Sequence, residues 1–257
     1  MAKIKKTIRA GRLVKTVIYT APEPRDTPRE RAEKSRATTA AQKKMNDKSA
    51  RSRLEMLLAA NFNGRDLFIT LTYRADALPA KRADAIKNVR YFLRCLRETR
   101  KMRGQSLKYI YTTENKHGSG RFHHHIVMSS TGDDLATIKS LWAYGDVVDM
   151  EYIAQRDYDT WAQYITKESA EERPVGAQMW TGSKGLNKPI VERCYVPNDT
   201  AIDTPTGCHI IEREEKITEF GRYFYIKYLL PRERDTNEFT PHFQGADAAF
   251  SLTCSKI

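Results

Sequence analysis

The stretch Arg121–Met128, RFHHHIVM, places three of the chain's six histidines directly before an apolar run. The apolar and β-branched residues after the histidines favour a β-strand. Because side chains alternate between the faces of a strand, His123 and His125 point to one face and His124 to the other. Two imidazoles on one face can bind a single cation, so this stretch predicts a metal site.

A third ligand is expected from the segment just upstream. Residues 107–114, LKYIYTTE, are rich in aromatic and β-branched residues and predict a strand. With a four-residue hairpin loop over 117–120, Glu114 lies opposite His123, and opposed residues share a sheet face with Cβ atoms roughly 5 Å apart. Glu114, His123 and His125 then form a two-histidine, one-carboxylate set. Such a set suits Mg²⁺ or Mn²⁺ acting on an oxygen-containing substrate.

Composition limits the kind of protein. A chain of 257 residues with 40% hydrophobic content forms one large domain or one domain with appendages. No apolar run approaches the ~18 residues of a membrane span, and the N-terminus lacks the apolar segment of a signal peptide. The four cysteines show no C-x-x-C spacing and predict reduced thiols. We therefore expect a cytoplasmic protein without a membrane partner.

Positive charge is concentrated near the N-terminus. Residues 1–54 hold 16 Lys and Arg against 5 Asp and Glu, so they carry nearly all of the chain's net charge of +12. A basic arm on a near-neutral body indicates attraction to a polyanion, nucleic acid first. The alternative is a solvated helix face.

Hydrophobic periodicity predicts the order of elements along the chain. The expected strands cover 13–19, at a sheet edge, and 67–73, 107–114, 123–128, 147–153 and 220–230; the expected helices cover 29–60, 83–102, a stretch capped by Asp133 or Asp134, and 157–170.

From residue 67 onward the order is β-α-β-β-α-β followed by a helix. This is the ferredoxin-like split β-α-β arrangement, an α+β fold with an antiparallel sheet and helices on one face. Its first and third strands are central neighbours, so 67–73 lies beside the histidine strand and the other sheet face stays free for a ligand. We expect a basic N-terminal extension over 1–62, the main domain over 63–230 and a flexible tail over 231–257.

A candidate nucleophile lies in the last predicted helix. Tyr164 and Lys167 are three residues apart and share a helix face. A tyrosine hydroxyl, with a pKa near 10, is a weak nucleophile unless a cation or base assists it. A metal held by the three ligands would stabilise charge on a phosphodiester, while Lys167 orients Tyr164 or stabilises charge near the phosphate.

Three motifs in this order resemble those of HUH-type endonucleases of the rolling-circle replication initiator class, found in plasmids and in single-stranded DNA phages and viruses. They are FITLTY at 68–73, HHHIVM at 123–128 and YITK at 164–167. Residues 181–189, TGSKGLNKP, are similar to a segment that follows the tyrosine in phage-like initiators. The resemblance covers roughly half of the chain, from 67 to 189.

The chain departs from the family pattern at two points. His124 stands where an aliphatic residue is usual, so either His124 faces the helices or the register uses it in place of its neighbours. The second departure is the lack of a paired tyrosine. Tyr158 precedes Tyr164 by six residues and lies on another helix face, so we expect a single-tyrosine enzyme.

The resemblance implies a metal-dependent nicking and joining reaction. Tyr164 attacks a phosphate in single-stranded DNA at a replication origin, possibly at a hairpin, forms a 5′-phosphotyrosine and releases a 3′-OH for the polymerase. The chain has no P-loop sequence, so unwinding falls to a host helicase or supercoiling in a bacterial or phage-infected cell. The expected DNA contacts are Lys43, Lys44, Arg51, Thr70, Thr72, Lys116 and Arg121.

Two other functions fit the same residues. A transposase or plasmid relaxase would use the same chemistry on a different substrate. A non-catalytic nucleic-acid-binding protein would use the ferredoxin-like sheet and the basic arm, and its binding would not depend on metal.

Overall fold

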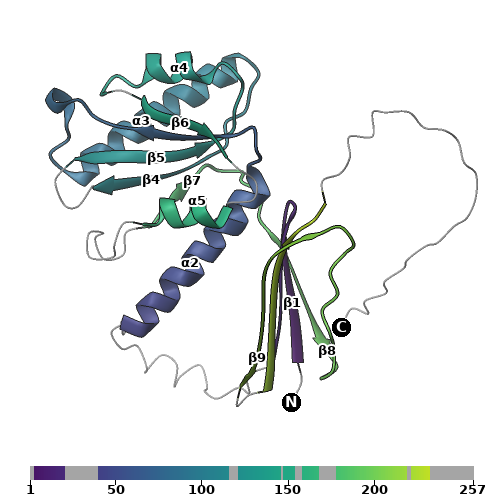
Figure 1. Ribbon diagram of the computed structural model, residues 1–257. Helices are drawn as coiled ribbons and strands as arrows, with labels where there is room; N and C mark the ends of the chain where they lie inside the picture. The colour runs from purple at the N-terminus through teal and green to yellow at the C-terminus, as the bar shows by residue number, and fades with distance from the viewer. Residues whose placement is uncertain are drawn as a thin grey trace, which may run out of the picture.

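The computed structural model describes residues 3–20, 40–115, 121–145, 147–153, 158–167, 178–218 and 221–231. These residues form two five-stranded antiparallel sheets and helices, which confirms the predicted α+β class. In Figure 1 the two sheets are separate bodies, and the helix α2 (Ala40–Asn61) runs between them. No helix in these ranges is both long and apolar enough to span a membrane.

The first sheet, here called the site sheet, has the strand order β6-β3-β5-β4-β7. Its strands are β3 (Leu67–Leu71), β4 (Tyr109–Asn115), β5 (Phe122–Met128), β6 (Val147–Tyr152) and β7 (Thr181–Gly182). As predicted, β3 lies beside the histidine strand β5, with Thr70 opposite His125. The expected hairpin loop over 117–120 lies outside the described residues, as do helix residues 29–39 and 168–170 and the tail from 232.

Both faces of the site sheet are covered by helices. On one face, α3 (Arg82–Met102) and α4 (Asp134–Leu141) bury side chains such as Phe92 and Ile138 against Ile69 and Ile126. On the other face, α2 and α5 (Tyr158–Ile165) pack Leu58 and Ile165 against Phe68 and Val127.

The expectation of a free sheet face was therefore wrong. All five residues of β3 are buried, and a strand that is apolar on both faces needs cover on both. The candidate ligands lie on the face that α2 and α5 share, beside the covered part rather than on an open surface.

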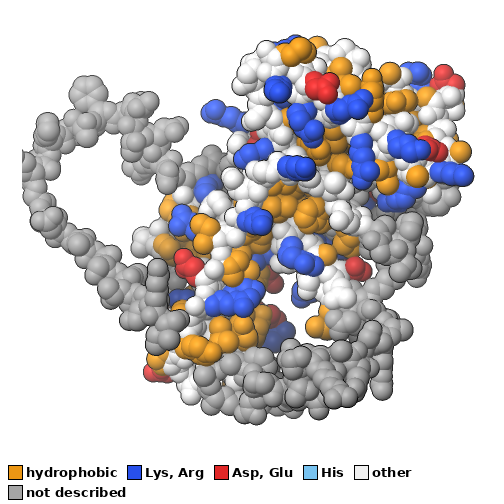
Figure 2. All heavy atoms as spheres, turned by 180° about the vertical axis from the view of Figure 1, so that it is seen from behind, with side chains coloured by type: hydrophobic (Ala, Val, Ile, Leu, Met, Phe, Trp, Pro, Cys, Tyr) orange, Lys and Arg blue, Asp and Glu red, His pale blue; other side chains and the backbone are white. Residues whose placement is uncertain are grey.

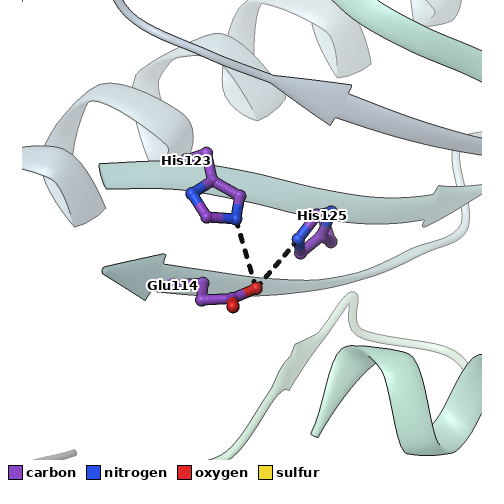
Figure 3. Close-up of side chains that lie close together, drawn as sticks. All are labelled: Glu114, His123 and His125. Carbon is purple, nitrogen blue, oxygen red and sulfur yellow. Dashed lines mark hydrogen bonds and ion pairs between the residues drawn. The ribbon is translucent and has the colours of Figure 1, made fainter. Parts of the chain in front are cut away.

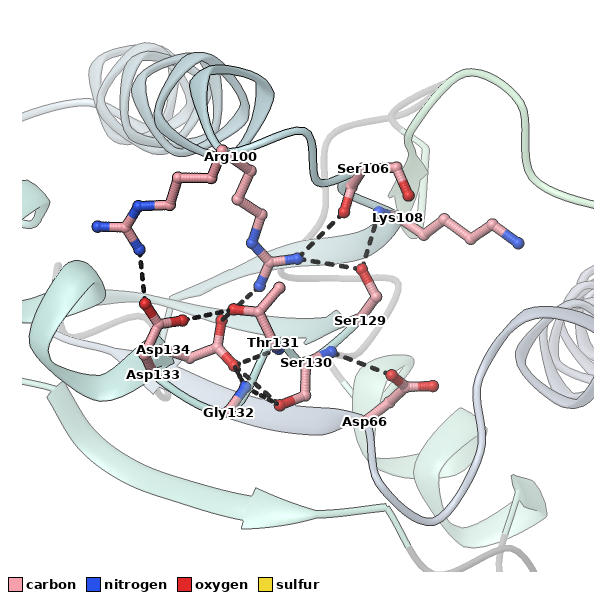
Figure 4. Close-up of polar contacts among 11 residues, drawn as sticks. Asp66, Arg100, Ser106, Lys108, Ser129, Ser130, Thr131, Gly132, Asp133 and Asp134 are labelled. Carbon is pink, nitrogen blue, oxygen red and sulfur yellow. Dashed lines mark hydrogen bonds and ion pairs between the residues drawn. The ribbon is translucent and has the colours of Figure 1, made fainter.

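A polar network joins the end of α3 to the start of α4 (Figure 4). Asp133 occupies the N-cap position without a capping hydrogen bond, whereas Asp134 accepts hydrogen bonds from the backbone of Thr131 and from the hydroxyl of Ser130. The guanidinium of Arg100 donates to the same carboxylate at 2.5 Å. Asp134 thus anchors the start of this helix, through more partners than a simple cap.

The second sheet has the order β8-β1-β2-β10-β9. Its strands are β1 (Lys3–Ala10), β2 (Leu13–Thr20), β8 (Ile190–Val196), β9 (His209–Thr218) and β10 (Gly221–Leu229). The strand predicted over 13–19 is present, but it lies inside this sheet between β1 and β10, so its expected edge position was wrong. The strand predicted over 220–230 is confirmed as β10.

The second sheet meets α2 through a close backbone approach and a buried ion cluster. Gly11, with φ of 54°, turns the β1–β2 hairpin where an added Cβ would lie 2.6 Å from the carbonyl oxygen of Ala59. Glu55 of α2 pairs with Lys15 at 2.5 Å and with Lys227 at 3.4 Å, and all three side chains are buried. The division of the chain at residue 62 stays a prediction, and the first twenty residues share this sheet with residues 190–229.

Candidate active site

The β4–β5 hairpin has the predicted register. Glu114 pairs with His123, and the same strand face carries His125 two residues further along. Oε2 of Glu114 lies 3.2 Å from Nε2 of His123 and 3.0 Å from Nε2 of His125 (Figure 3). The predicted alternation of the strand therefore brings the three side chains together.

These three residues have the geometry of a metal-binding group. One ligand atom from each of Glu114, His123 and His125 lies within 4.8 Å of the others. Two neutral imidazole nitrogens and one carboxylate oxygen are suitable donors for a divalent first-row ion or Mg²⁺. The residues present therefore fit a divalent ion, and the choice of Mg²⁺ or Mn²⁺ stays a prediction.

The protonation states favour cation binding. Burial alone would raise the pKa of Glu114, but the hydrogen bonds from His123 and His125 and the charge of Lys167 lower it far below its ordinary value. Burial lowers the pKa of His125, and the hydrogen bond to Glu114 offsets this only in part. An ionised carboxylate and a neutral imidazole are the forms that coordinate metals.

His124 has a structural role on the opposite face. Its Nε2 lies 2.8 Å from the hydroxyl of Tyr73 and its Nδ1 lies 2.9 Å from the hydroxyl of Thr113. Burial lowers the pKa of His124 to about 3, which keeps the ring neutral. Of the two alternatives for this departure from the family pattern, His124 facing the helices is the one observed.

Two residues of β3 surround His125. Oγ1 of Thr70 lies 3.1 Å from Nδ1 of His125, and the ring of Phe68 stacks on the imidazole with an interplanar angle of 18°. The sequence did not single out these contacts. Strand alternation could have found them, because Phe68 and Thr70 share a face that pairs with the histidine strand.

Tyr164 of α5 lies across from the histidines. Its ring centre is 4.9 Å from that of His125 and 5.5 Å from that of Phe68, and the residue is 39% exposed. Lys167 follows the end of α5; its Nζ lies 3.8 Å from the centre of the Tyr164 ring and 3.3 Å from Oε2 of Glu114. The predicted nucleophile and cation therefore lie beside the predicted ligands.

The residues expected to contact DNA are more scattered. Thr70 is only 7% exposed, and its observed partner is His125. Thr72 is partly exposed, and its carbonyl accepts a hydrogen bond from Trp142; Arg51 of α2 donates to the hydroxyl of Thr166; Arg121 is exposed at the start of β5. Lys116 and the side chains of Lys43 and Lys44 lie outside the described residues. Contact of all seven with DNA stays a prediction.

Fold and site together define an α+β protein with a possible divalent-metal centre beside an accessible tyrosine. Residues 66–169 match a family model of replication-associated proteins, the ORF2 type. The matched segment runs from β3 to the end of α5 and includes Glu114, His123, His125, Tyr164 and Lys167. The match supports a Rep-type replication initiator. No curated protein and no solved structure matches the chain.

Proposed function

We propose that this protein is a rolling-circle replication initiator that nicks and rejoins single-stranded DNA through a covalent intermediate on Tyr164. The observation that carries the proposal is the position of Tyr164 beside His125, with Lys167 in contact with both the tyrosine ring and Glu114. The match of this segment to a replication-associated family supports the biological context.

In the proposed nicking step, the hydroxyl oxygen of Tyr164 loses its proton to solvent or a nearby base and attacks the scissile phosphorus. A bond forms between this oxygen and phosphorus, and the bond from phosphorus to the 3′ oxygen breaks. The leaving oxygen takes up a proton and becomes a 3′-OH, while the 5′ end stays on the tyrosine. In the joining step a 3′-OH attacks the phosphotyrosine and restores the phosphodiester.

The surrounding side chains prepare Tyr164 for this role. The ammonium of Lys167 lies over the tyrosine ring and stabilises negative charge that develops on the phenol oxygen. Phe68 and His125 contact the ring from the sheet side, which restricts its orientation. Glu114, His123 and His125 would hold a Mg²⁺ or Mn²⁺ ion, which when bound supplies Lewis-acid stabilisation to the phosphate oxygens.

The partners follow from the products of this chemistry. A free 3′-OH primes a host polymerase, and a host helicase or supercoiling exposes the single strand. A relaxase or a transposase would perform the same steps on another substrate, and the replication-associated match favours the initiator.

The test is transfer of a labelled single-stranded DNA to the protein, seen as a band that survives SDS. A pool of random-sequence oligonucleotides with Mn²⁺ removes the need to know the origin. We expect a labelled band that disappears with EDTA and with Tyr164→Phe. Tyr195→Phe, which changes an exposed tyrosine of β8, is the matched control and should label normally.

Normal labelling of Tyr164→Phe would remove this residue from its proposed role. No labelling of the wild type across the pool, with DNA binding intact and independent of metal, would favour the non-catalytic binding protein.

A further inference from the structure

A groove of about 900 Å³ lies between α2, β1 and residues 178–191. Its apolar wall comes from both sides and includes Met56, Leu57, Trp180 and Leu186. This volume lies within the range of ~300–1,000 Å³ that is usual for ligand sites. The groove is distinct from the candidate ligand group and from the tyrosine.

We propose that this groove binds unpaired bases of the single-stranded DNA that flank the scissile phosphate. The position of that phosphate rests on the proposed function, while base binding by the groove is a property of the groove itself. Three observations support the assignment: its lining, its charge and its connection to the candidate active site.

The lining suits a base that is not paired. Trp180 is partly exposed and offers an aromatic face, while Met56 and Leu57 provide an apolar surface opposite. Stacking on aromatic side chains is the usual way in which proteins hold single-stranded DNA, because every base has a π-face. In a duplex these faces are already stacked, so the groove favours single strands.

The charge around the groove suits a phosphate backbone. Lys6, Arg53 and Lys188 line it, and none of its lining residues is acidic. Within the described part of the chain, these three cations form no ion pair with a carboxylate. Figure 2, the view from behind, shows many Lys and Arg side chains and few acidic ones around exposed hydrophobic groups on that face of the molecule.

The groove is connected to the candidate active site on both sides. The hydroxyl of Thr112, which lies opposite His125 in the sheet, donates to the carbonyl of Met179 at 2.9 Å. On the other wall, Arg51 of α2 donates to Thr166, the residue before Lys167. A strand that leaves Tyr164 can therefore pass directly into the groove.

Close packing sets the shape of the groove near Trp180. A Cβ added at Gly182 would lie 2.8 Å from Cδ1 of Leu186 and 3.9 Å from Cζ3 of Trp180. The glycine thus lets Leu186 and Trp180 come together at the end of the groove beside β4. A preformed surface of this kind binds without a large ordering cost.

The first test measures binding of a fluorescent single-stranded oligonucleotide pool by anisotropy, in EDTA so that metal plays no part. We expect Trp180→Ala to weaken binding about tenfold, and Trp180→Phe, which keeps an aromatic ring, to recover most of the affinity. Duplex DNA should bind the wild type and Trp180→Ala equally. Thermal unfolding followed by circular dichroism shows whether each variant is folded.

The second test uses charge. Replacing Lys6, Arg53 and Lys188 together by Gln should reduce the slope of log affinity against log salt by about two for single strands. The matched control replaces Lys87, Lys101 and Lys139, which are exposed on α3 and α4, and should leave the slope nearly unchanged.

The outcomes separate this inference from the proposed function. Folded Trp180→Ala with wild-type affinity, or equal salt slopes in both triple variants, would overturn the groove even if the covalent band forms normally. Weakened binding in the Trp180 and charge variants, with no covalent band in the wild type, would support the groove and contradict the nicking reaction.

Discussion

Nζ of Lys167 lies 3.3 Å from Oε2 of Glu114, the same oxygen to which His123 and His125 are hydrogen-bonded. The ammonium group therefore neutralises the carboxylate that is also the only acidic member of the candidate ligand group. A cation at this position competes with Lys167 for Glu114, while Lys167 also contacts the Tyr164 ring.

Replacing Lys167 by Met should therefore have opposite effects on binding and on chemistry. Affinity for Mn²⁺ should increase about threefold to tenfold, because a partly exposed like charge is removed from the site. Formation of the covalent DNA adduct should slow by about tenfold or more, because the developing phenolate loses its cation. Isothermal titration calorimetry and the timed gel assay measure the two effects. Lys139→Met is the control, and weaker Mn²⁺ binding in Lys167→Met would contradict the competition.

Thr70 is expected to position His125 for metal binding. When Nε2 of His125 binds a metal, Nδ1 carries the proton and the hydroxyl of Thr70 becomes its acceptor. Thr70→Val, which keeps the shape but lacks the hydroxyl, should weaken Mn²⁺ binding about tenfold, and Thr70→Ser should retain it. Equal affinity in the Val and Ser variants would show that the hydroxyl contributes nothing to the site.

Glu55 should be important for stability because it neutralises two buried lysines. Glu55→Gln leaves Lys15 and Lys227 without this carboxylate and should lower the free energy of unfolding by about 3 kcal/mol. Asp84→Asn, which removes an exposed pair with Lys87, should change it by less than about 0.5 kcal/mol. Urea denaturation measures both, and similar values for the two variants would contradict a role for burial.

Asp134 should make stability depend on pH. Burial alone would raise its pKa, but hydrogen bonds from Thr131 and Ser130 and the charge of Arg100 lower it below its ordinary value. A carboxyl with a lowered pKa stabilises the fold above its unfolded pKa of about 4, and this contribution is lost as the pH falls through the folded pKa.

Asp134→Asn should therefore cost about 2 kcal/mol at pH 7. The difference from the wild type should shrink as the pH falls below about 4, where the wild-type carboxyl begins to be protonated. Asp133→Asn, which alters an exposed pair with Arg103, is the control and should have little effect at either pH. A difference that does not change between the two pH values would show that ionisation of Asp134 is not the cause.

The site sheet could be predicted from sequence because its signals are local and strong. The alternation in FHHHIVM determined which histidines share a face, and the hairpin register then placed Glu114 opposite His123. The contact of Thr70 with His125 depends on pairing between strands 55 positions apart, although alternation along both strands is compatible with it.

The second sheet was mostly missed because its strands lack these signals. In β1, lysines stand among the apolar residues, and β8 is largely exposed, so neither shows the pattern of a buried strand. Their stability comes from pairing with strands far away in the chain. Cover of the site sheet by α2 was missed because only the last part of that helix is apolar, and periodicity does not say which surface a helix covers.

The N-terminal hairpin lies between two strands that are made much later in translation. β1 pairs with β8 and β2 pairs with β10, so the ribbon leaves the ribosome with both edges open. A two-stranded ribbon is only marginally stable on its own. The site sheet needs nothing beyond Gly182, whereas Lys6 and Val191 face each other across the groove only after β8 has been synthesised. A nascent chain can therefore complete its candidate catalytic centre before it gains the surface proposed to hold DNA.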